Sequence, residues 1–131
     1  MIAVDTSAVV AIALQEPEGE RYSQRIVEKG AVIGTPTLVE CRMVLNTRMP
    51  VFVDRFMQGF VEREAVHPAD FTFEMYEAAV AAFGRFGKGR GHRAQLNFGD
   101  CLAYAVAKQH DIPLLYKGDD FSHTDVRRAA S

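Results

Sequence analysis

The chain has only two cysteines, no long apolar run and almost no net charge. Cys41 and Cys101 stand far apart, without the clustered spacing that a zinc site needs. The longest apolar run, Ala8 to Leu14, is far shorter than the ~20 residues that cross a bilayer. With 15 Lys and Arg against 17 Asp and Glu, the net charge of −2 excludes a uniformly basic nucleic-acid binder, although it allows a local basic patch.

The N-terminus shows no secretory signal, because Met1 to Asp5 contain neither a basic segment nor a long apolar one. We therefore expect a cytoplasmic protein whose two cysteines are reduced and mostly buried, although their spacing alone leaves a disulfide open. The 131 residues, 48% of them hydrophobic, suit one globular domain with a hydrophobic core. We expect that single domain to span residues 1–131.

Short apolar segments alternate with helical patterns along the chain. The expected strands cover residues 2–4, 31–34, 65–68 and 112–116. The expected helices cover residues 7–15, 17–29, 37–48, 51–64, 70–86 and 97–110. Thr6 or Ser7 can cap the first helix. This alternation is typical of an α/β domain with a mainly parallel sheet and helices on both faces.

One face of the helix expected over residues 70–86 carries large apolar side chains at helical spacing. They are Phe73, Tyr76, Val80 and Phe83. We expect this face to belong to the hydrophobic core rather than to form a platform on which bases stack.

Acidic residues gather near the ends of three expected strands. Asp5 follows the first strand, and Glu40 lies one turn into the helix after the second. Asp100 lies one turn into the helix before the last strand, which Asp119 and Asp120 follow. Ligands bind outside the carboxyl ends of parallel strands, so these acids are expected to lie close together there. Clustered carboxylates repel one another, and oxygen ligands without Cys or His favour Mg²⁺ or Mn²⁺.

Most of these acids also have a purely structural interpretation. Thr37-x-x-Glu40 and Asn97-x-x-Asp100 both have the spacing of a capping box, and aspartate is common in turns such as the one after the last strand. Asp5 is the exception, because a carboxylate that ends an apolar strand contributes little to stability.

Four segments resemble a known family in their order and spacing. They are Val4-Asp5-Thr6-Ser7-Ala8, Thr37-Leu38-Val39-Glu40, Leu96-Asn97-Phe98-Gly99-Asp100-Cys101-Leu102-Ala103-Tyr104 and Leu114-Leu115-Tyr116-Lys117-Gly118-Asp119-Asp120-Phe121. Over essentially its whole length the chain resembles the PIN-domain ribonucleases, and most closely the VapC-type toxins of type II toxin–antitoxin systems. The Asn97 to Asp100 block is the most specific element.

The resemblance implies a PIN-like fold, with a short parallel β-sheet between α-helices, and a Mg²⁺-dependent endoribonuclease, with Mn²⁺ as the alternative metal. Asp5, Glu40 and Asp100 match the family's catalytic and metal-binding acids directly. Asp119 matches the fourth acidic position, with Asp120 as its substitute. The metal would lower the pKa of a bound water, and the resulting hydroxide would attack an RNA phosphodiester bond in line.

The resemblance also implies partners. These are an RNA substrate, such as tRNA or rRNA, a cognate VapB-type antitoxin and a second copy of the chain in a homodimer, with no membrane involved. An apolar helix surface over residues 51–64, together with the second helix, is expected to bind the antitoxin or the second copy.

Two other functions fit parts of the sequence. A phosphohydrolase with Asp5 as nucleophile usually needs a second acid two residues later, where Ser7 stands. A catalytically silent PIN-fold module that binds RNA or protein would be favoured by a missing acid, yet Asp5, Glu40 and Asp100 are all present.

Residues 84–93 (GRFGKGRGHR) are rich in glycine and positive charge. A nuclease with an acidic pocket needs positive charge nearby to hold the RNA backbone. Lys88, Arg90 and Arg93 are therefore expected to bind RNA, with a solvated flexible loop as the alternative. Arg127 and Arg128 are weaker candidates for the same role.

Overall fold

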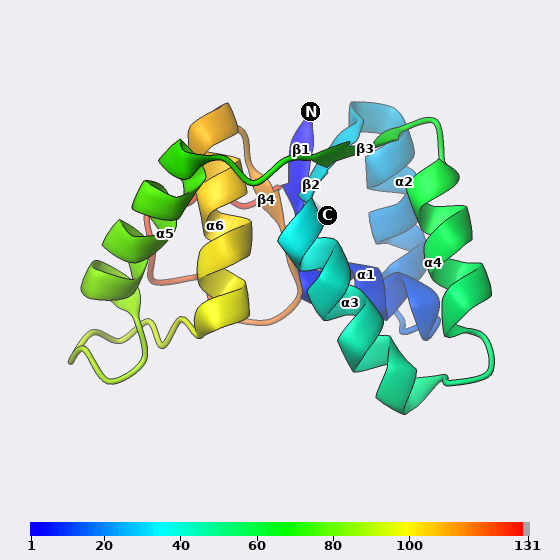
Figure 1. The fold of residues 1–131 in the computed structure, drawn as a ribbon, viewed down its shortest axis with the longest axis horizontal. Helices are drawn as coiled ribbons and strands as arrows, with labels where there is room; N and C mark the ends of the chain where they lie inside the picture. The colour runs from blue at the N-terminus through cyan, green and yellow to red at the C-terminus, as the bar shows by residue number, and fades with distance from the viewer. Residues whose placement is uncertain (130–131) are drawn as a thin grey trace.

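The structure is a computed structural model that describes residues 1–129. A four-stranded sheet lies between two groups of helices (Figure 1). The strands are β1 (Ile2–Val4), β2 (Ala31–Gly34), β3 (Val66–Ala69) and β4 (Leu114–Leu115). They pair in parallel in the order β3–β2–β1–β4. The expected α/β class with a parallel sheet is confirmed, while the last two residues of the expected domain lie outside the described part.

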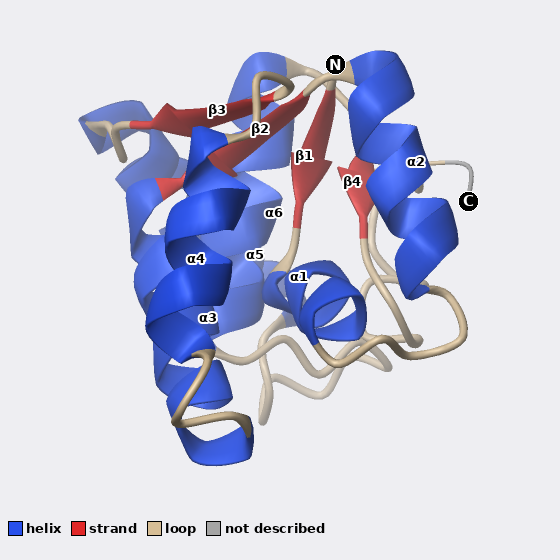
Figure 2. Cartoon of the chain, turned by 90° about the vertical axis from the view of Figure 1, so that its right-hand side faces the viewer, coloured by secondary structure: helices blue, strands red, loops and turns tan. Residues whose placement is uncertain are grey.

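The helices cover both faces of the sheet because neighbouring side chains of a strand point to opposite faces. They are α1 (Thr6–Ala13), α2 (Gly19–Lys29), α3 (Thr35–Arg48), α4 (Val53–Glu62), α5 (Phe73–Phe86) and α6 (Phe98–His110). In β1, Ile2 and Val4 pack with α1 to α4, whereas Ala3 packs with α5 and α6. In Figure 2, α1 lies below the lower ends of β1 and β4, which is the edge where the expected acids should gather.

Both cysteines are free and buried, as predicted. Cys41 lies in the core on the α1 to α4 side of the sheet, and Cys101 lies in the core on the other side. Within residues 1–129, no helix is both long enough and apolar enough to cross a membrane.

Two expectations about α1 and α5 are wrong at the residue level. The side-chain cap of α1 is Asp5, not Thr6 or Ser7, and the helix already begins at Thr6. The helix expected from residue 70 begins at Phe73, because the Thr72 side chain accepts a hydrogen bond from the Met75 amide and forms its N-cap.

The large apolar face of α5 is exposed, so the prediction that it belongs to the core is wrong. The exposed fractions are 69% for Phe73, 53% for Tyr76, 55% for Val80 and 45% for Phe83. The buried face of α5 instead carries Met75, Ala82 and Phe86, with the half-buried Ala78 and Ala79 packed beside them. Helical spacing shows which side chains share one face of a helix, but it does not show which face packs against the core. Here the face with the small alanine side chains is the buried one, because small side chains allow α5 to lie close to α6.

Candidate active site

Asp5 occupies the point where β1 passes into α1. Its backbone amide donates to the Leu115 carbonyl of β4 at 3.0 Å, which ties the residue to the neighbouring strand. Its Oδ2 accepts hydrogen bonds from the Ser7 amide at 3.0 Å and from the Ser7 hydroxyl at 2.6 Å. Burial outweighs these bonds and raises the pKa of Asp5 to about 6, and the charge of Glu40 acts in the same direction.

Ser7 connects the Asp5 carboxylate to the segment that follows β4. Besides donating to Asp5, its hydroxyl oxygen accepts the backbone amide of Lys117 at 3.0 Å. Ser7 therefore holds the Asp5 carboxylate in place through a neutral hydroxyl group. A phosphohydrolase would be expected to have a second acid at this position.

Glu40 reaches the same region from α3. The Thr6 hydroxyl donates to Glu40 Oε1 at 2.5 Å, although the two residues are 34 positions apart. The capping-box interpretation of Glu40 is wrong, because the N-cap of α3 is Gly34 and no side chain caps this helix. The helix starts before Thr37, so Glu40 lies beyond the position at which a capping box would form.

Asp100 both caps a helix and belongs to the acidic group. Asn97 is the N-cap of α6, and its side chain accepts the Asp100 amide at 2.9 Å. In return, Asp100 Oδ2 accepts the Asn97 amide at 3.0 Å, which completes a capping box. The pKa of Asp100 is raised to about 7, chiefly by burial and also by the charges of Asp5, Asp120 and Glu40, although the hydrogen bond from the Asn97 amide acts in the opposite direction. Asp5, Glu40, Asp100 and Asp120, which we call the acidic group, thus come from elements that are distant in the sequence, and the charges of the other three act on Asp100.

Asp119 and Asp120 both lie exposed in the turn after β4. Asp120 is the one whose charge contributes to the raised pKa of Asp100. Asp119 shapes the turn, since its carbonyl accepts the Ser122 amide at 3.0 Å.

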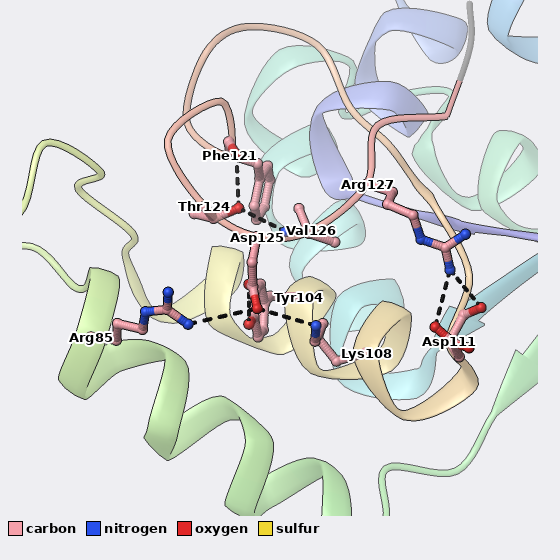
Figure 3. A network of polar contacts seen from close by, with 9 residues as sticks. All are labelled: Arg85, Tyr104, Lys108, Asp111, Phe121, Thr124, Asp125, Val126 and Arg127. Carbon is pink, nitrogen blue, oxygen red and sulfur yellow. Dashed lines mark hydrogen bonds and ion pairs between the residues drawn. The ribbon is translucent and has the colours of Figure 1, made fainter.

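The segment after this turn is fastened to α6 through Asp125 (Figure 3). The Tyr104 hydroxyl donates to Asp125 Oδ1 at 2.5 Å, and the Lys108 ammonium donates to Oδ2 at 3.2 Å. Arg85 of α5 adds a longer ion pair at 3.7 Å. Because Tyr104 lies on the same helix as Asp100, this anchor holds the turn after β4 against the helix that supplies Asp100.

The acidic group has no positive side chain bound to it. No salt bridge within residues 1–129 involves Asp5, Glu40, Asp100 or Asp120. Asp5, Glu40 and Asp100 each accept a hydrogen bond from a neutral group instead. Among the described residues, no three Asp, Glu, His or Cys side chains lie close enough together to hold a metal ion. Carboxylate oxygens that form no salt bridge within the described residues are nevertheless a donor set that suits Mg²⁺ or Mn²⁺.

The basic segment, residues 87–93, follows α5 and returns toward the start of α6, whereas residues 84–86 of the glycine-rich stretch belong to α5. It is closed by a backbone hydrogen bond from the Lys88 amide to the Leu96 carbonyl at 2.9 Å. The side chains of Lys88, Arg90 and Arg93 are exposed, and they form no salt bridge with other residues of the 1–129 range. Three positive charges are therefore available near the N-terminal end of α6.

The two weaker basic candidates are engaged within the protein. Arg127 forms an ion pair with Asp111 at 3.1 Å (Figure 3), and it also donates to the Asp111 carbonyl. The Arg128 guanidinium lies 4.2 Å from the centre of the Tyr116 ring. Both arginines therefore hold the C-terminal segment in place.

Two features of the site were not predicted from the sequence. The contact between Thr6 and Glu40 joins residues that are distant in the chain, so spacing could not predict it. Phe98, between the N-cap of α6 and Asp100, is 80% exposed, which is unusual for a phenylalanine. Its position inside the Asn97 to Asp100 block was a clue, because an exposed aromatic ring beside a candidate site offers a stacking surface.

Comparisons with known proteins identify the family and the fold. The family model for the PIN domain matches residues 2–127. Ribonuclease VapC28 of Mycobacterium tuberculosis is 37% identical over 127 residues, which cover 96% of each chain. The crystal structure of Mycobacterium tuberculosis VapC20, described as a Sarcin-Ricin loop cleaving toxin, has a TM-score of 0.74 at 19% identity and covers 97% of this chain and 99% of that one.

A toxin–antitoxin complex from Klebsiella pneumoniae contains a chain of the same fold, with a TM-score of 0.69 at 13% identity, covering 95% of this chain and 93% of that one. At such low identities the structural likenesses establish the fold alone. The family match and the relative at 37% identity extend over nearly the whole chain. This chain therefore belongs to the PIN-domain family, among the VapC ribonucleases.

Proposed function

We propose that this chain is a divalent-metal-dependent endoribonuclease, formed by a single PIN domain, and that it acts in the cytoplasm as the toxin of a toxin–antitoxin pair. The observation that carries the proposal is the acidic group, in which burial and neighbouring negative charges raise the pKa values of Asp5 and Asp100. No salt bridge among the described residues neutralises this group. The relatives named ribonucleases supply the reaction class.

Mg²⁺, or Mn²⁺ in its place, would be held by Asp5 and Asp100, with Glu40 binding it directly or through water. Asp120 is the better fourth acid, because its charge acts on Asp100, and Asp119 is the alternative. When bound, the cation supplies a water of lowered pKa and offsets the negative charge that develops on the phosphate.

Two hydroxyl groups hold the carboxylates for this task. Ser7 orients Asp5, and Thr6 orients Glu40. An ionised carboxylate has about four acceptor positions, so these hydrogen bonds leave oxygen lone pairs available to a cation. A fixed carboxylate loses less conformational freedom when a ligand binds, and the hydroxyls therefore favour binding by preorganisation.

Incubation of the purified chain with tRNA and rRNA tests the proposal. Discrete cleavage products are expected on a gel in the presence of Mg²⁺ or Mn²⁺, and excess chelator is expected to prevent their formation. RNA binding without cleavage in both metals would contradict the proposal and favour a catalytically silent RNA-binding module instead.

The exposed basic segment is proposed to hold the RNA backbone. Replacing Lys88, Arg90 and Arg93 by Ala should weaken RNA binding and flatten its dependence on salt, because fewer phosphates are neutralised. On a single strand, the log–log slope should fall by ~0.7 for each phosphate that the variant no longer binds. The cleavage rate at saturating RNA should change much less than the affinity, because these side chains do not carry the metal. Binding measured across a salt series gives the slope.

Phe98→Ala is the matched comparison for this prediction. Loss of base stacking lowers affinity by roughly 1–3 kcal/mol per base but removes no positive charge. We therefore expect this variant to bind RNA more weakly with an unchanged salt slope. An unchanged slope in the triple variant would show that the basic segment is only a solvated loop.

Two separate surfaces are proposed for the protein partners. A second copy would cover the apolar face of α5, because apolar patches of this kind usually mark contact sites. An antitoxin segment would lie in the groove of about 600 Å³ between α3 and α4, which includes part of the predicted 51–64 surface but not the second helix. Its lining residues are Leu38, Val39, Arg42, Asp54, Met57, Gln58 and Val61.

Matched Val→Glu substitutions distinguish these surfaces. Val80→Glu, on α5, should convert a dimer to a monomer in light scattering and leave antitoxin binding intact. Val61→Glu, in the groove, should weaken antitoxin binding at least 10-fold and leave the dimer intact, since a buried unpaired charge opposes an apolar contact. The assignment of α5 to the second copy and of the groove to the antitoxin would be contradicted by an unsubstituted chain that is monomeric. It would also be contradicted if Val80→Glu weakened antitoxin binding and Val61→Glu disrupted the dimer.

A further inference from the structure

Gly99 is buried in the first turn of α6, directly against the carboxylate of Glu40. A Cβ atom built on Gly99 would lie 1.8 Å from Glu40 Oε2 and 2.4 Å from its Cδ. No side chain can occupy that space while Glu40 keeps its position. The Glu40 carboxylate is therefore held between the Cα of Gly99, which it contacts, and the Thr6 hydroxyl, from which it accepts a hydrogen bond.

The backbone at Gly99 does not itself require glycine. The residue lies inside an α-helix and is not among the glycines with positive φ. Alanine is a better helix former than glycine, so local helix stability alone would favour a side chain here. The lack of one is explained by the contact with Glu40.

Other glycines of the chain show what distinguishes this contact. At Gly19 a Cβ would lie 2.4 Å from the backbone carbonyl oxygen of Ala11, so that glycine is required by the packing of main chain against main chain. At Gly59 and Gly84, in α4 and α5, a Cβ would meet nothing within 4 Å. Only at Gly99 would it meet the flexible end of a candidate metal-binding side chain.

We propose that Gly99 is a positioning residue that sets where the Glu40 carboxylate stands relative to Asp5 and Asp100. This inference rests on the proposed function, because it assigns the position of Glu40 to metal binding. A methyl group at residue 99 would push the carboxylate away from the N-terminal turn of α6 and from the Thr6 hydroxyl. The helix would tolerate the change, since Glu40 can move without displacing backbone.

Gly99→Ala should therefore impair the site and leave the fold intact. We expect its melting temperature to stay within about 4 °C of the unsubstituted chain, since no buried backbone has to move. Its affinity for Mn²⁺, measured by calorimetry on metal-free protein, should fall about 10- to 100-fold, which is typical when the support of a metal ligand is removed. Gly84→Ala is the matched control and should change neither quantity by a comparable amount.

A double-mutant cycle shows whether Gly99 acts through Glu40. Glu40→Ala removes the carboxylate, so adding Gly99→Ala to it should cause no further loss of Mn²⁺ affinity. A full additional loss in the double variant would overturn the proposal, because Gly99 would then act by another route. So would a Gly99→Ala variant that binds Mn²⁺ normally, or one that melts far lower.

The same titrations separate this proposal from the proposed function. If Glu40→Ala weakens Mn²⁺ binding and Gly99→Ala does not, the metal site stands and the positioning role alone is wrong. If the unsubstituted chain takes up no Mn²⁺, the metal site is wrong, and the role of Gly99 fails with it.

Discussion

Asp100→Asn is expected to abolish RNA cleavage and leave the fold intact. The loss of a residue that merely supports a metal ligand typically costs 10- to 100-fold, so the loss of a ligand should lower the cleavage rate by more than ~100-fold. The fold should survive because the asparagine carbonyl oxygen can still accept the Asn97 amide, as Asp100 does now at 3.0 Å. Gel assays with excess Mg²⁺ and thermal melts of the same preparation provide the two measurements.

The stability of this variant is informative by itself. In metal-free buffer above neutral pH, removing one charge from the acidic group relieves repulsion, so Asp100→Asn should melt at the same temperature as the parent or higher. Asp100→Ala, which also loses the acceptor of the capping box, should be less stable than the asparagine variant by about 1 kcal/mol. Strong destabilisation of Asp100→Asn with normal cleavage would show that this residue is only a helix cap.

The fourth acid can be identified in the same assay. Because the charge of Asp120 contributes to the raised pKa of Asp100, Asp120→Asn should slow cleavage. Asp119→Asn, a neighbouring substitution of identical chemistry, should have the smaller effect. The opposite order would assign the role to Asp119, as its earlier place in the turn suggests.

In metal-free buffer the protein should become less stable as the pH rises from about 4 to 8. The pKa of Asp5 is about 6 and that of Asp100 about 7 in the folded chain, against an ordinary value of 3.8. Between these values the folded state binds more protons than the unfolded state, so its stability falls with rising pH. At ~1.4 kcal/mol per pKa unit, Asp5 alone contributes a loss on the order of 3 kcal/mol.

Thermal melts in chelator at pH 5 and pH 8 test this dependence. Between pH 5 and pH 8, about one unit of the raised pKa of Asp5 and about two of Asp100 take effect, which at ~1.4 kcal/mol per unit is a loss on the order of 4 kcal/mol. For a chain of this length, such a loss corresponds to a melting temperature lower by more than about 10 °C at the higher pH. Asp125 and Glu18 do not account for such a fall, because their pKa values are lowered and they act at more acidic pH. A melting temperature that rises between pH 5 and pH 8 would contradict the raised pKa values.

Two controls connect the pH dependence to the acidic group. Asp100→Asn should flatten the profile, because the residue no longer titrates. Added Mg²⁺ should reduce the fall in stability at pH 8, since a cation that binds only the folded, ionised site stabilises that state. Equal profiles with and without metal would show that these carboxylates do not share a cation.

Local patterns in the amino-acid sequence were enough to predict the order of helices and strands, the parallel α/β class and the burial of both cysteines. These features follow from local patterns: apolar runs of strand length, helical spacing, and breaks such as Gly30, which has a positive φ and ends α2. The family resemblance predicted the acids Asp5, Glu40 and Asp100. Their catalytic roles remain predictions, although the fold brings these residues toward one edge of the sheet.

Contacts between distant elements select which of several local possibilities a residue adopts. Glu40 had the spacing of a capping box, yet it accepts a hydrogen bond from Thr6, because α3 begins before Thr37 and packs beside α1. The aromatic face of α5 was expected in the core, yet it is exposed, and the face with small alanines meets α6 instead. Such choices depend on contacts between residues far apart in the chain, which compete with local preferences and which no local pattern records.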